Sequence, residues 1–257
     1  MIEIDRLTFG YASADPIFEG FSWGVSSGEA WCILGPSGCG KTTLLYLLAG
    51  LRRPLAGTVS IDGHSLDRPR PRTGLVLQDF GLLPWATVEE NIALGLRVRG
   101  FYGPDGRHAP PDDAVGQIEE RVRRWLDRMG LETVRRQYPG QLSGGQRQRT
   151  AIARTLALHP DLLLMDEPFG SLDAPTREAL QDLTLQLRSE GDLTLILVTH
   201  TLEEAAFLGS RILLLGRPPT RHAEIVENPR AGTAAFRQSS DYAELCRGLR
   251  ARLGALA

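Results

Sequence analysis

The stretch that decides the fold is AWCILGPSGCGKTTLLYLLAGL, residues 30–51. It starts as a short apolar run typical of a buried strand, passes through a glycine-rich turn and continues as an apolar segment of helical length. Within it, GPSGCGKTT (residues 35–43) fits the pattern G-x-x-x-x-G-K-[ST] in the strand-to-helix setting that this pattern requires. The sequence therefore predicts a loop whose backbone amides and helix N-terminus hold phosphate groups.

Lys41 gives a second argument for phosphate binding. Lysine and arginine together number 29, and because Lys41 is the only lysine, 28 of these residues are arginine. A compact ammonium group fits between the β- and γ-phosphates of a nucleotide, whereas a planar guanidinium is bulkier and requires bidentate geometry. Thr42 would add a hydroxyl group for Mg²⁺. An ordinary glycine turn that caps a helix is the alternative, and it leaves the retained lysine unexplained.

Carboxylates follow another apolar run, LLLMDEP at residues 162–168. Asp166, at the end of the predicted strand, can hold Mg²⁺, and Glu167 is placed to take a proton from an attacking water. Carboxylates also commonly open solvated loops, and the phosphate loop upstream is what favours the metal site. Gln78 and His200 end apolar runs too, and each taken singly is more often an ordinary edge residue than a catalytic one.

A serine and two glycines open the segment QLSGGQRQRTAIARTLA, residues 141–157. Ser143 and Gln146 have the spacing of a capping box, which by itself predicts only a helix start. Gly144 and Gly145 would expose backbone amides at that helix N-terminus and so form a second anion site. Without such a role the two glycines weaken the helix start for no visible gain.

The rest of the chain predicts an α/β fold. Strands that alternate with helices indicate a parallel sheet with functional groups at the carboxyl ends of its strands. Residues 87–160 are predicted to form a helical lobe inserted into this sheet, with an exposed loop at 100–113. Helices are expected at 87–100, 114–130, 131–137 and 175–189, and strands at 2–9, 17–25, 30–34, 58–63, 73–78, 162–168 and 193–200.

Composition limits the possible functions. The net charge of −2 argues against a protein that binds nucleic acid by bulk attraction. The three cysteines are widely separated, lack metal-ligand spacing and indicate a reducing compartment. No segment approaches the ~18–20 apolar residues that cross a bilayer, so any membrane role is expected to be peripheral.

Together the motifs resemble those of the ATP-binding subunits of ABC transporters, over nearly the whole chain. In chain order they resemble Walker A (35–43), the Q-loop glutamine (Gln78), the LSGGQ signature (142–146), Walker B (162–167), the D-loop (171–173) and the switch histidine (His200). The resemblance implies an α/β fold of the P-loop NTPase type, an ABC ATPase. Such a fold has a mixed or parallel sheet core, an N-terminal antiparallel β subdomain and an inserted helical lobe.

The resemblance also implies a site. The cofactors would be ATP and Mg²⁺, with Thr42, Gln78 and Asp166 toward the metal. Catalytic roles would fall to Glu167, His200, Gln78 and Lys41. Phe9 competes with Tyr11 as the aromatic ring that stacks on adenine. Nucleotide contacts are expected from Tyr11, Gly35, Pro36, Ser37, Gly38, Cys39, Gly40, Lys41, Thr42, Thr43, Ser143, Gly144, Gly145, Gln146 and Asp173.

Partners are implied in the same way. Two subunits would pair head to tail around two ATP molecules, at the cytoplasmic face of the inner membrane. They would act with two integral membrane permease subunits and, indirectly, an extracytoplasmic substrate-binding protein, and without nucleic acid. The phrase QDFGLLPWATVEENIALGL (78–96) is similar to ATPases of nitrate, sulfonate and taurine importers. An importer of another solute, such as a thiamine precursor, is one alternative. A soluble ATP-gated clamp is another, but it requires long coiled coils that the sequence lacks.

The domain boundaries are expected from the same resemblance. Residues 1–231 would form the ATPase domain, with its helical lobe at about 87–160. Residues 232–257 would form a closing amphipathic helix and leave no room for a regulatory domain.

Three narrower expectations concern single positions. Cys39, near a helix N-terminus, predicts a thiol of lowered pKa, although a small filler residue is equally compatible with the sequence. Thr201 and Glu204 have capping-box spacing. The apolar side chains of residues 79–85 predict an exposed cluster that docks a membrane subunit beside the helical lobe, with burial in the lobe as the alternative for two of them. The cluster consists of Phe80, Leu82, Leu83 and Trp85.

Overall fold

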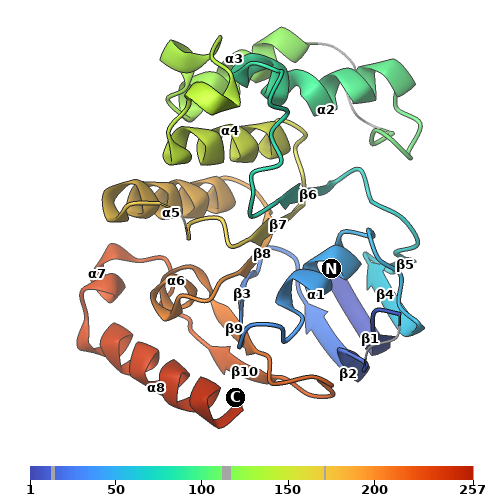
Figure 1. Ribbon diagram of the computed structural model, residues 1–257, viewed down its shortest axis with the longest axis vertical. Helices are drawn as coiled ribbons and strands as arrows, with labels where there is room; N and C mark the ends of the chain where they lie inside the picture. The colour runs from blue at the N-terminus through green and yellow to red at the C-terminus, as the bar shows by residue number, and fades with distance from the viewer. Residues whose placement is uncertain (13–14, 112–116, 171, 257) are drawn as a thin grey trace.

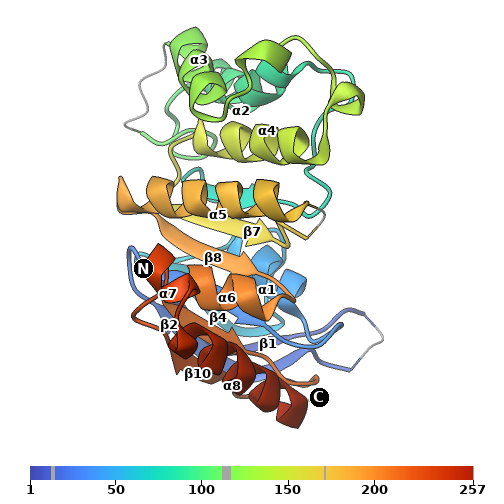
Figure 2. The same ribbon diagram turned by 90° about the vertical axis from the view of Figure 1, so that its left-hand side faces the viewer.

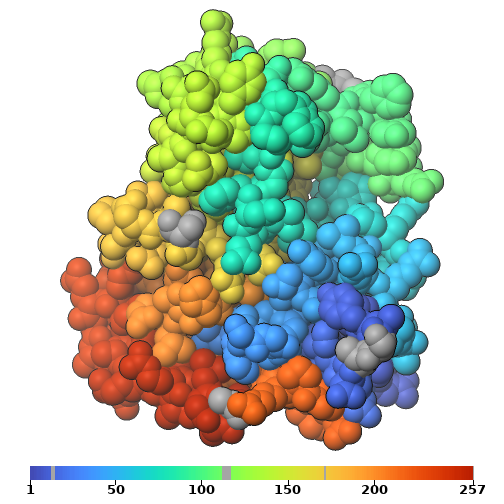
Figure 3. Space-filling view, in the orientation of Figure 1, coloured from blue at the N-terminus to red at the C-terminus, as the bar shows by residue number. Residues whose placement is uncertain are grey.

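The computed structural model describes residues 1–12, 15–111, 117–170 and 172–256. The helical lobe lies at one end of the long axis and the two β-sheets lie toward the other, as Figures 1 and 2 show. In the space-filling view the segment that leads from β6 into the lobe crosses the front of the molecule between core and lobe (Figure 3). No helix in the described ranges is long and apolar enough to cross a membrane.

The larger sheet has six strands within the described residues, in the order β10-β9-β3-β8-β7-β6. All neighbouring pairs are parallel except β10 with β9. The three central strands are entirely buried, as expected for strands that are covered on both faces. The strands are β10 (Glu224–Glu227), β9 (Arg211–Leu214), β3 (Ala30–Leu34), β8 (Thr194–Val198), β7 (Leu162–Asp166) and β6 (Thr73–Val76).

The smaller sheet is antiparallel and lies at the N-terminal side of the core (Figure 1). Its strands follow the order β2-β1-β4-β5. The bounds are β1 (Ile2–Phe9), β2 (Phe18–Val25), β4 (Ala56–Ile61) and β5 (His64–Ser65). This arrangement confirms the predicted mixed sheet core with an antiparallel N-terminal subdomain.

Helices cover both faces of the larger sheet. The core helices are α1 (Lys41–Leu48), α5 (Ala174–Ser189), α6 (Leu202–Leu208), α7 (Ala234–Arg237) and α8 (Ser240–Leu256). The lobe contains α2 (Val88–Tyr102), α3 (Ile118–Arg128), α4 (Gly144–Leu156) and the 3-10 turns η1 (Glu132–Val134) and η2 (Pro139–Gln141). The lobe helices are short, which excludes the long coiled coils that a clamp would need.

Strand β3 shows how the two faces are built. Side chains alternate across a strand, so Trp31 and Ile33 point to the face that packs with α1 and the antiparallel sheet. Ala30, Cys32 and Leu34 point to the opposite face, toward α6 and the lobe side. The strand therefore joins two hydrophobic cores and delivers the glycine-rich loop at its carboxyl end.

Several predicted elements differ from the structure. Strands β5, β9 and β10 were not predicted. β5 has only two residues, β10 is a half-exposed edge strand, and β9 is a short apolar run close behind α6. The helix expected at 131–137 is a single 3-10 turn, η1. The helix expected at 114–130 is α3, which begins at Ile118. Residues 114–116 of the expected helix lie outside the described ranges. The loop expected at 100–113 begins after Tyr102, where α2 ends.

Candidate active site

The phosphate loop leaves the N-terminus of α1 open. Its N-cap is Gly40, in the left-handed conformation at φ 100°, and no side chain caps the helix. A Cβ at Gly40 would lie 2.4 Å from Ile17 Cγ2, so both the conformation and the space require glycine. The first backbone N–H groups of a helix have no partner within the helix. This helix end is therefore available to an anion.

Lys41 lies folded over the loop. Its side chain is 8% exposed, and Nζ donates to the carbonyl oxygens of Gly35 and Pro36, each at 2.9 Å. The ammonium group is thus held at the centre of the loop by backbone acceptors. Phosphate oxygens that entered the loop could replace those carbonyls as partners of Nζ.

Cys39 does not have the lowered pKa that its position predicted. The side chain is fully buried, and burial raises the pKa of the thiol. The neighbouring Lys41 ammonium lowers the pKa by less than burial raises it. The prediction of a lowered pKa was therefore wrong, and Cys39 is a small buried residue of the loop itself.

The three side chains expected near Mg²⁺ line one pocket. Thr42, Gln78 and Asp166 surround a hollow of about 480 Å³ together with Tyr46, Leu77 and Asp79. Thr42 Oγ1 donates to Asp166 Oδ1 at 3.2 Å. Burial raises the pKa of the Asp166 carboxyl, because its charge has little solvent around it. A hydroxyl, an amide and a buried carboxylate are oxygen donors of the kind Mg²⁺ prefers, so the residues fit that ion.

Glu167 and His200 are paired beside this pocket. His200 Nδ1 lies 3.0 Å from Glu167 Oε2, at hydrogen-bond distance. The backbone of Glu167 is in the left-handed region at φ 45°, and its N–H donates to the carbonyl of Val198. Because His200 is exposed and Glu167 half-buried, the pair sits at the surface of the core and can reach an incoming water.

The signature residues form a helix N-terminus that is capped by its own side chains. Ser143 Oγ accepts from the Gln146 backbone N–H at 3.2 Å, and Gln146 Oε1 accepts from the Ser143 N–H at 2.8 Å. This is the capping box that the spacing predicted. The site lies on the lobe, and its residues do not line the pocket of Thr42, Gln78 and Asp166. Within one chain the two predicted phosphate-binding segments are not brought together.

Asp173 caps α5 next to the signature. Its carboxylate accepts from the Thr176 N–H at 3.1 Å, and this bond lowers the pKa of Asp173. A Cβ at Gly145 would lie 2.6 Å from Thr176 Cγ2, so the signature glycine packs against the first turn of α5. Ser171, which the D-loop resemblance also includes, lies outside the described residues.

Of the two candidate adenine-stacking rings, only that of Tyr11 is accessible. Phe9 is buried in the antiparallel sheet at 5% exposure, whereas Tyr11 is 43% exposed. The hydroxyl of Tyr11 lies 3.3 Å from Thr43 Oγ1, and the Arg52 guanidinium lies 5.9 Å from the ring centroid. These contacts hold the Tyr11 ring beside α1.

The apolar loop after Gln78 is only partly exposed. Trp85 is 73% exposed, but Phe80 and Leu82 pack partly against the core, and Leu83 is half-buried. The predicted exposed cluster is therefore reduced to one tryptophan. Arg154, at the end of α4, donates to the carbonyls of Phe80 and Gly81 at 2.9 and 2.6 Å. No sequence pattern indicates this link, because the acceptors are backbone atoms 73 and 74 residues away along the chain.

The expected capping box at α6 is absent. The side chain of Thr201 makes no capping bond. Glu204 instead accepts from the Thr199 hydroxyl at 2.5 Å. The spacing was right for a box, but a buried threonine two residues before Thr201 offers the carboxylate a closer partner.

The fold, the glycine-rich loop and the adjacent carboxylates Asp166 and Glu167 define a class of nucleotide-hydrolysing proteins. Comparison with known proteins identifies the family. The family model described as ABC transporter matches residues 18–170, and the chain belongs to this family. It is an ABC transporter ATPase, in which ATP hydrolysis is coupled to transport.

Individual relatives agree with this assignment. The chain is 46% identical to the taurine import ATP-binding protein TauB of Pseudomonas aeruginosa over 207 residues, which is 80% of this chain and 73% of the relative. It is 37% identical to the aliphatic sulfonates import ATP-binding protein SsuB of Bacillus cereus, over 82% of this chain and 78% of the relative. Among solved structures, the dimeric ATP-binding cassette MJ0796 bound to ADP and Pi superposes with a TM-score of 0.75 at 30% identity. That match covers 90% of this chain and 100% of the other.

Proposed function

We propose that this chain powers the import of a small sulfonate-type solute by binding and hydrolysing ATP with Mg²⁺. The relatives named as taurine and aliphatic sulfonate import proteins support the solute class. The observation that carries the site is the convergence of Thr42, Gln78 and Asp166 on one pocket beside the Glu167–His200 pair. Oxygen donors for a metal and a base for a water thus lie next to an open helix N-terminus.

Each residue of the site has a proposed role. The open amides of α1 and the Lys41 ammonium bind the β- and γ-phosphates, and Tyr11 stacks on the adenine ring. Thr42, Gln78 and Asp166 would hold Mg²⁺, which when bound would supply positive charge to neutralise the phosphates. Glu167 takes the proton from the attacking water, and His200 keeps its carboxylate oriented.

The geometry supports a head-to-tail dimer as the hydrolysing form. Within one chain the signature residues stand on the lobe, apart from the phosphate loop (Figure 1). The solved cassette MJ0796 is described as dimeric in its ADP- and phosphate-bound state. Pairing two chains head to tail places the signature of each over the nucleotide of the other. Residues 1–231 would act as this ATPase domain and 232–257 as its closing helical segment.

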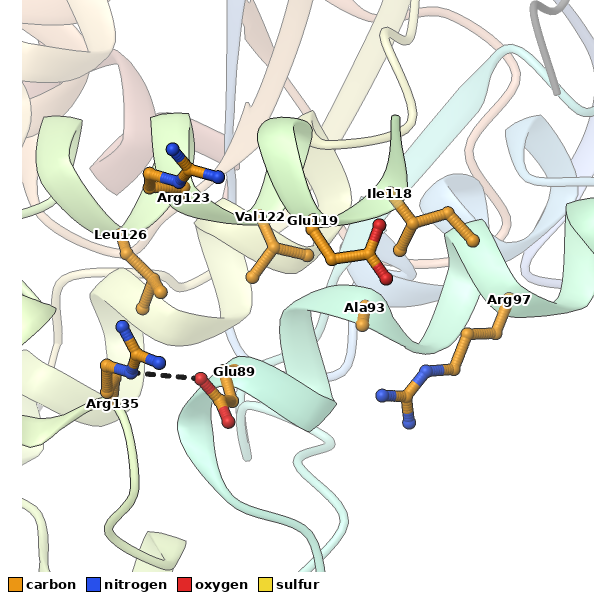
Figure 4. A pocket seen from close by; sticks show the side chains of 9 residues that line it. All are labelled: Glu89, Ala93, Arg97, Ile118, Glu119, Val122, Arg123, Leu126 and Arg135. Carbon is orange, nitrogen blue, oxygen red and sulfur yellow. Dashed lines mark ion pairs between the residues drawn. The ribbon is translucent and has the colours of Figure 1, made fainter. Parts of the chain in front are cut away.

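A groove in the lobe is the proposed contact for a membrane permease subunit at the cytoplasmic face of the membrane. A hollow of about 520 Å³ lies between α2 and α3. Figure 4 shows the side chains that line it. Side chains of α3 point across it toward α2, and an ion pair between Arg135 and Glu89 closes one end. An apolar floor with a charged rim fits a short amphipathic helix. Its lining consists of Glu89, Ala93, Arg97, Ile118, Glu119, Val122, Arg123, Leu126 and Arg135.

Cysteine crosslinking of the assembled transporter tests this contact. A cysteine at Arg97 or Trp85 should crosslink to a cytoplasmic loop of the permease, because Arg97 is exposed and lines the groove and Trp85 is exposed shortly before α2. A transport-active complex without any such crosslink would contradict the docking site and leave the ATPase assignment intact.

The Glu167→Gln variant tests the catalytic assignment. We expect ATP binding to persist and hydrolysis to fall by about 100-fold or more, because the amide keeps the shape of the side chain but is not a base. ATP hydrolysis and ATP affinity are measured together, with the exposed Glu203→Gln as the matched control. Turnover of Glu167→Gln close to the wild-type rate would reject Glu167 as the base. Binding of taurine and other alkylsulfonates to the partner substrate-binding protein tests the solute class.

A further inference from the structure

A buried threonine–glutamate pair lies directly behind His200. Thr199 is 1% exposed and Glu204 is 2% exposed. The Thr199 hydroxyl donates to Glu204 Oε2 at 2.5 Å. The second carboxylate oxygen, Oε1, is buried and has no hydrogen-bond partner among the described residues. Burial raises the pKa of Glu204, so the fold retains this carboxyl at a cost to its own stability.

The Thr199 side chain spans the backbone on both sides of His200. Its oxygen accepts from the Thr201 N–H at 3.0 Å, while its proton goes to Glu204. Its own backbone N–H donates to the carbonyl of Ile33 in β3, at 3.2 Å. A hydroxyl has a single proton, so the bond to Glu204 fixes its rotation and directs its lone pairs at Thr201. The Glu204 carboxylate therefore fixes the side-chain bond from Thr199 to Thr201, which spans His200.

The same turn is tied to the proposed base. Val198 precedes Thr199, and its carbonyl accepts from the Glu167 N–H at 2.9 Å. His200 in turn lies 3.0 Å from the Glu167 carboxylate. A shift of the turn would move His200 relative to the Glu167 carboxylate, and small displacements of reacting groups lower catalytic rates strongly.

We propose that Glu204 is a positioning residue for ATP hydrolysis, which acts on His200 through the Thr199 hydroxyl. This inference rests on the proposed roles of His200 and Glu167. It assigns a function to a buried carboxylate that touches neither the phosphate loop nor the metal pocket. The acceptor oxygen is what matters, and the negative charge is not required.

Substitutions at Glu204 separate the acceptor from the charge. Glu204→Gln keeps an oxygen acceptor for Thr199, so we expect kcat to stay within about threefold of wild type. Glu204→Leu has no acceptor, so we expect kcat to fall about tenfold or more. The ATP dissociation constant should stay within about twofold in both variants, because the phosphate loop is untouched. Glu203→Leu, at the exposed neighbouring position of the same helix, is the matched control.

A double-mutant cycle shows whether the effect passes through His200. In a His200→Ala background, Glu204→Leu should cause no further loss of kcat, because the group it positions is gone. Thr199→Val should reproduce the loss of Glu204→Leu, and Thr199→Ser should retain activity. The Thr199 variants also provide the test if Glu204→Leu does not fold, as judged by circular dichroism.

Three results would overturn the inference. These are normal kcat in Glu204→Leu, a loss in Glu204→Gln as large as in Glu204→Leu, and a Glu204→Leu loss that adds fully to that of His200→Ala. His200→Ala with wild-type turnover would instead contradict the proposed role of His200 itself. A defect in His200→Ala beside a normal Glu204→Leu would contradict this inference alone.

Discussion

The N-termini of α1 and α4 carry the phosphate loop and the signature motif, and they differ in capping. At α1 the cap is Gly40, no side chain caps the helix, and its amides are open. At α4 the cap is Ser143, which forms a complete capping box with Gln146. Neither first turn contains an acidic residue that would compete with a phosphate for the helix end.

This difference distinguishes a helix end that binds nucleotide in its own chain from one that completes the nucleotide site of a second chain. An uncapped helix end with a lysine folded over it is prepared for a ligand within its own chain. A self-capped end is stable without a ligand, and only amides beyond the box remain to be offered. We therefore infer that α1 binds ATP in a single chain, whereas α4 contributes only when a second chain brings nucleotide to it.

The largest expected effect is at α1. Lys41→Arg should lower ATP hydrolysis by about 100-fold or more, although the charge is conserved. The space is tight: Nζ sits 2.9 Å from two carbonyl oxygens, and a Cβ at Gly35 would lie 2.5 Å from Cys39 Sγ. Hydrolysis and ATP affinity of Lys41→Arg are compared with those of Lys41→Met. An arginine variant with near wild-type turnover would contradict the account of the single lysine.

A smaller effect is expected at α4. Ser143→Ala removes one half of the capping box and should lower the free energy of unfolding by ~1 kcal/mol. Ser143→Asn, which also caps helices well, should retain most of that stability. Urea unfolding measures both variants. ATP affinity of the single chain should not change, and a clear loss of affinity would mean that the signature contacts nucleotide within its own chain.

The third effect concerns the labelling rate of Cys39 and involves neither ATP hydrolysis nor stability. A thiol reacts as the thiolate, and because burial raises the pKa of Cys39, less thiolate is present at neutral pH than in an exposed thiol. Burial raises the pKa of Cys246 as well, but Cys246 is half-exposed whereas Cys39 is fully buried. Maleimide labelling of Cys39 should therefore be about tenfold or more slower than that of Cys246, and should rise with pH above the ordinary thiol range. Mass spectrometry of the labelled chain separates the sites. Equal rates at neutral pH would restore the reactive-thiol interpretation.

The sequence predicted the elements that local patterns encode. The G-x-x-x-x-G-K-[ST] pattern fixed the turn between β3 and α1, because glycine at positive φ and a buried lysine are local requirements. The apolar runs predicted β7 and β8, which are buried along their whole length. The capping box at Ser143 was also local, since its two partners are three residues apart.

Features that depend on distant partners were not predictable in the same way. Cys39 lies near a positive charge and a helix end, but its pKa follows from burial, which sequence spacing does not show. Glu204 has the correct spacing to cap α6, yet the tertiary fold offers it Thr199. Phe80 was predicted to be exposed in an apolar cluster, but it packs partly against the core, Arg147 lies 5.6 Å from its ring centroid and Arg154 donates to its carbonyl.

Disulfide crosslinking across the proposed dimer tests the comparison of α1 and α4 most directly. Ser37→Cys and Ser143→Cys are combined in a Glu167→Gln chain whose three native cysteines are replaced by serine or alanine, and oxidant is added with and without ATP. The account predicts an ATP-dependent product of twice the chain mass on a non-reducing gel, because the phosphate loop of one chain meets the signature of the other. A crosslink that forms within single chains, or none at all in a chain that binds ATP, would contradict it.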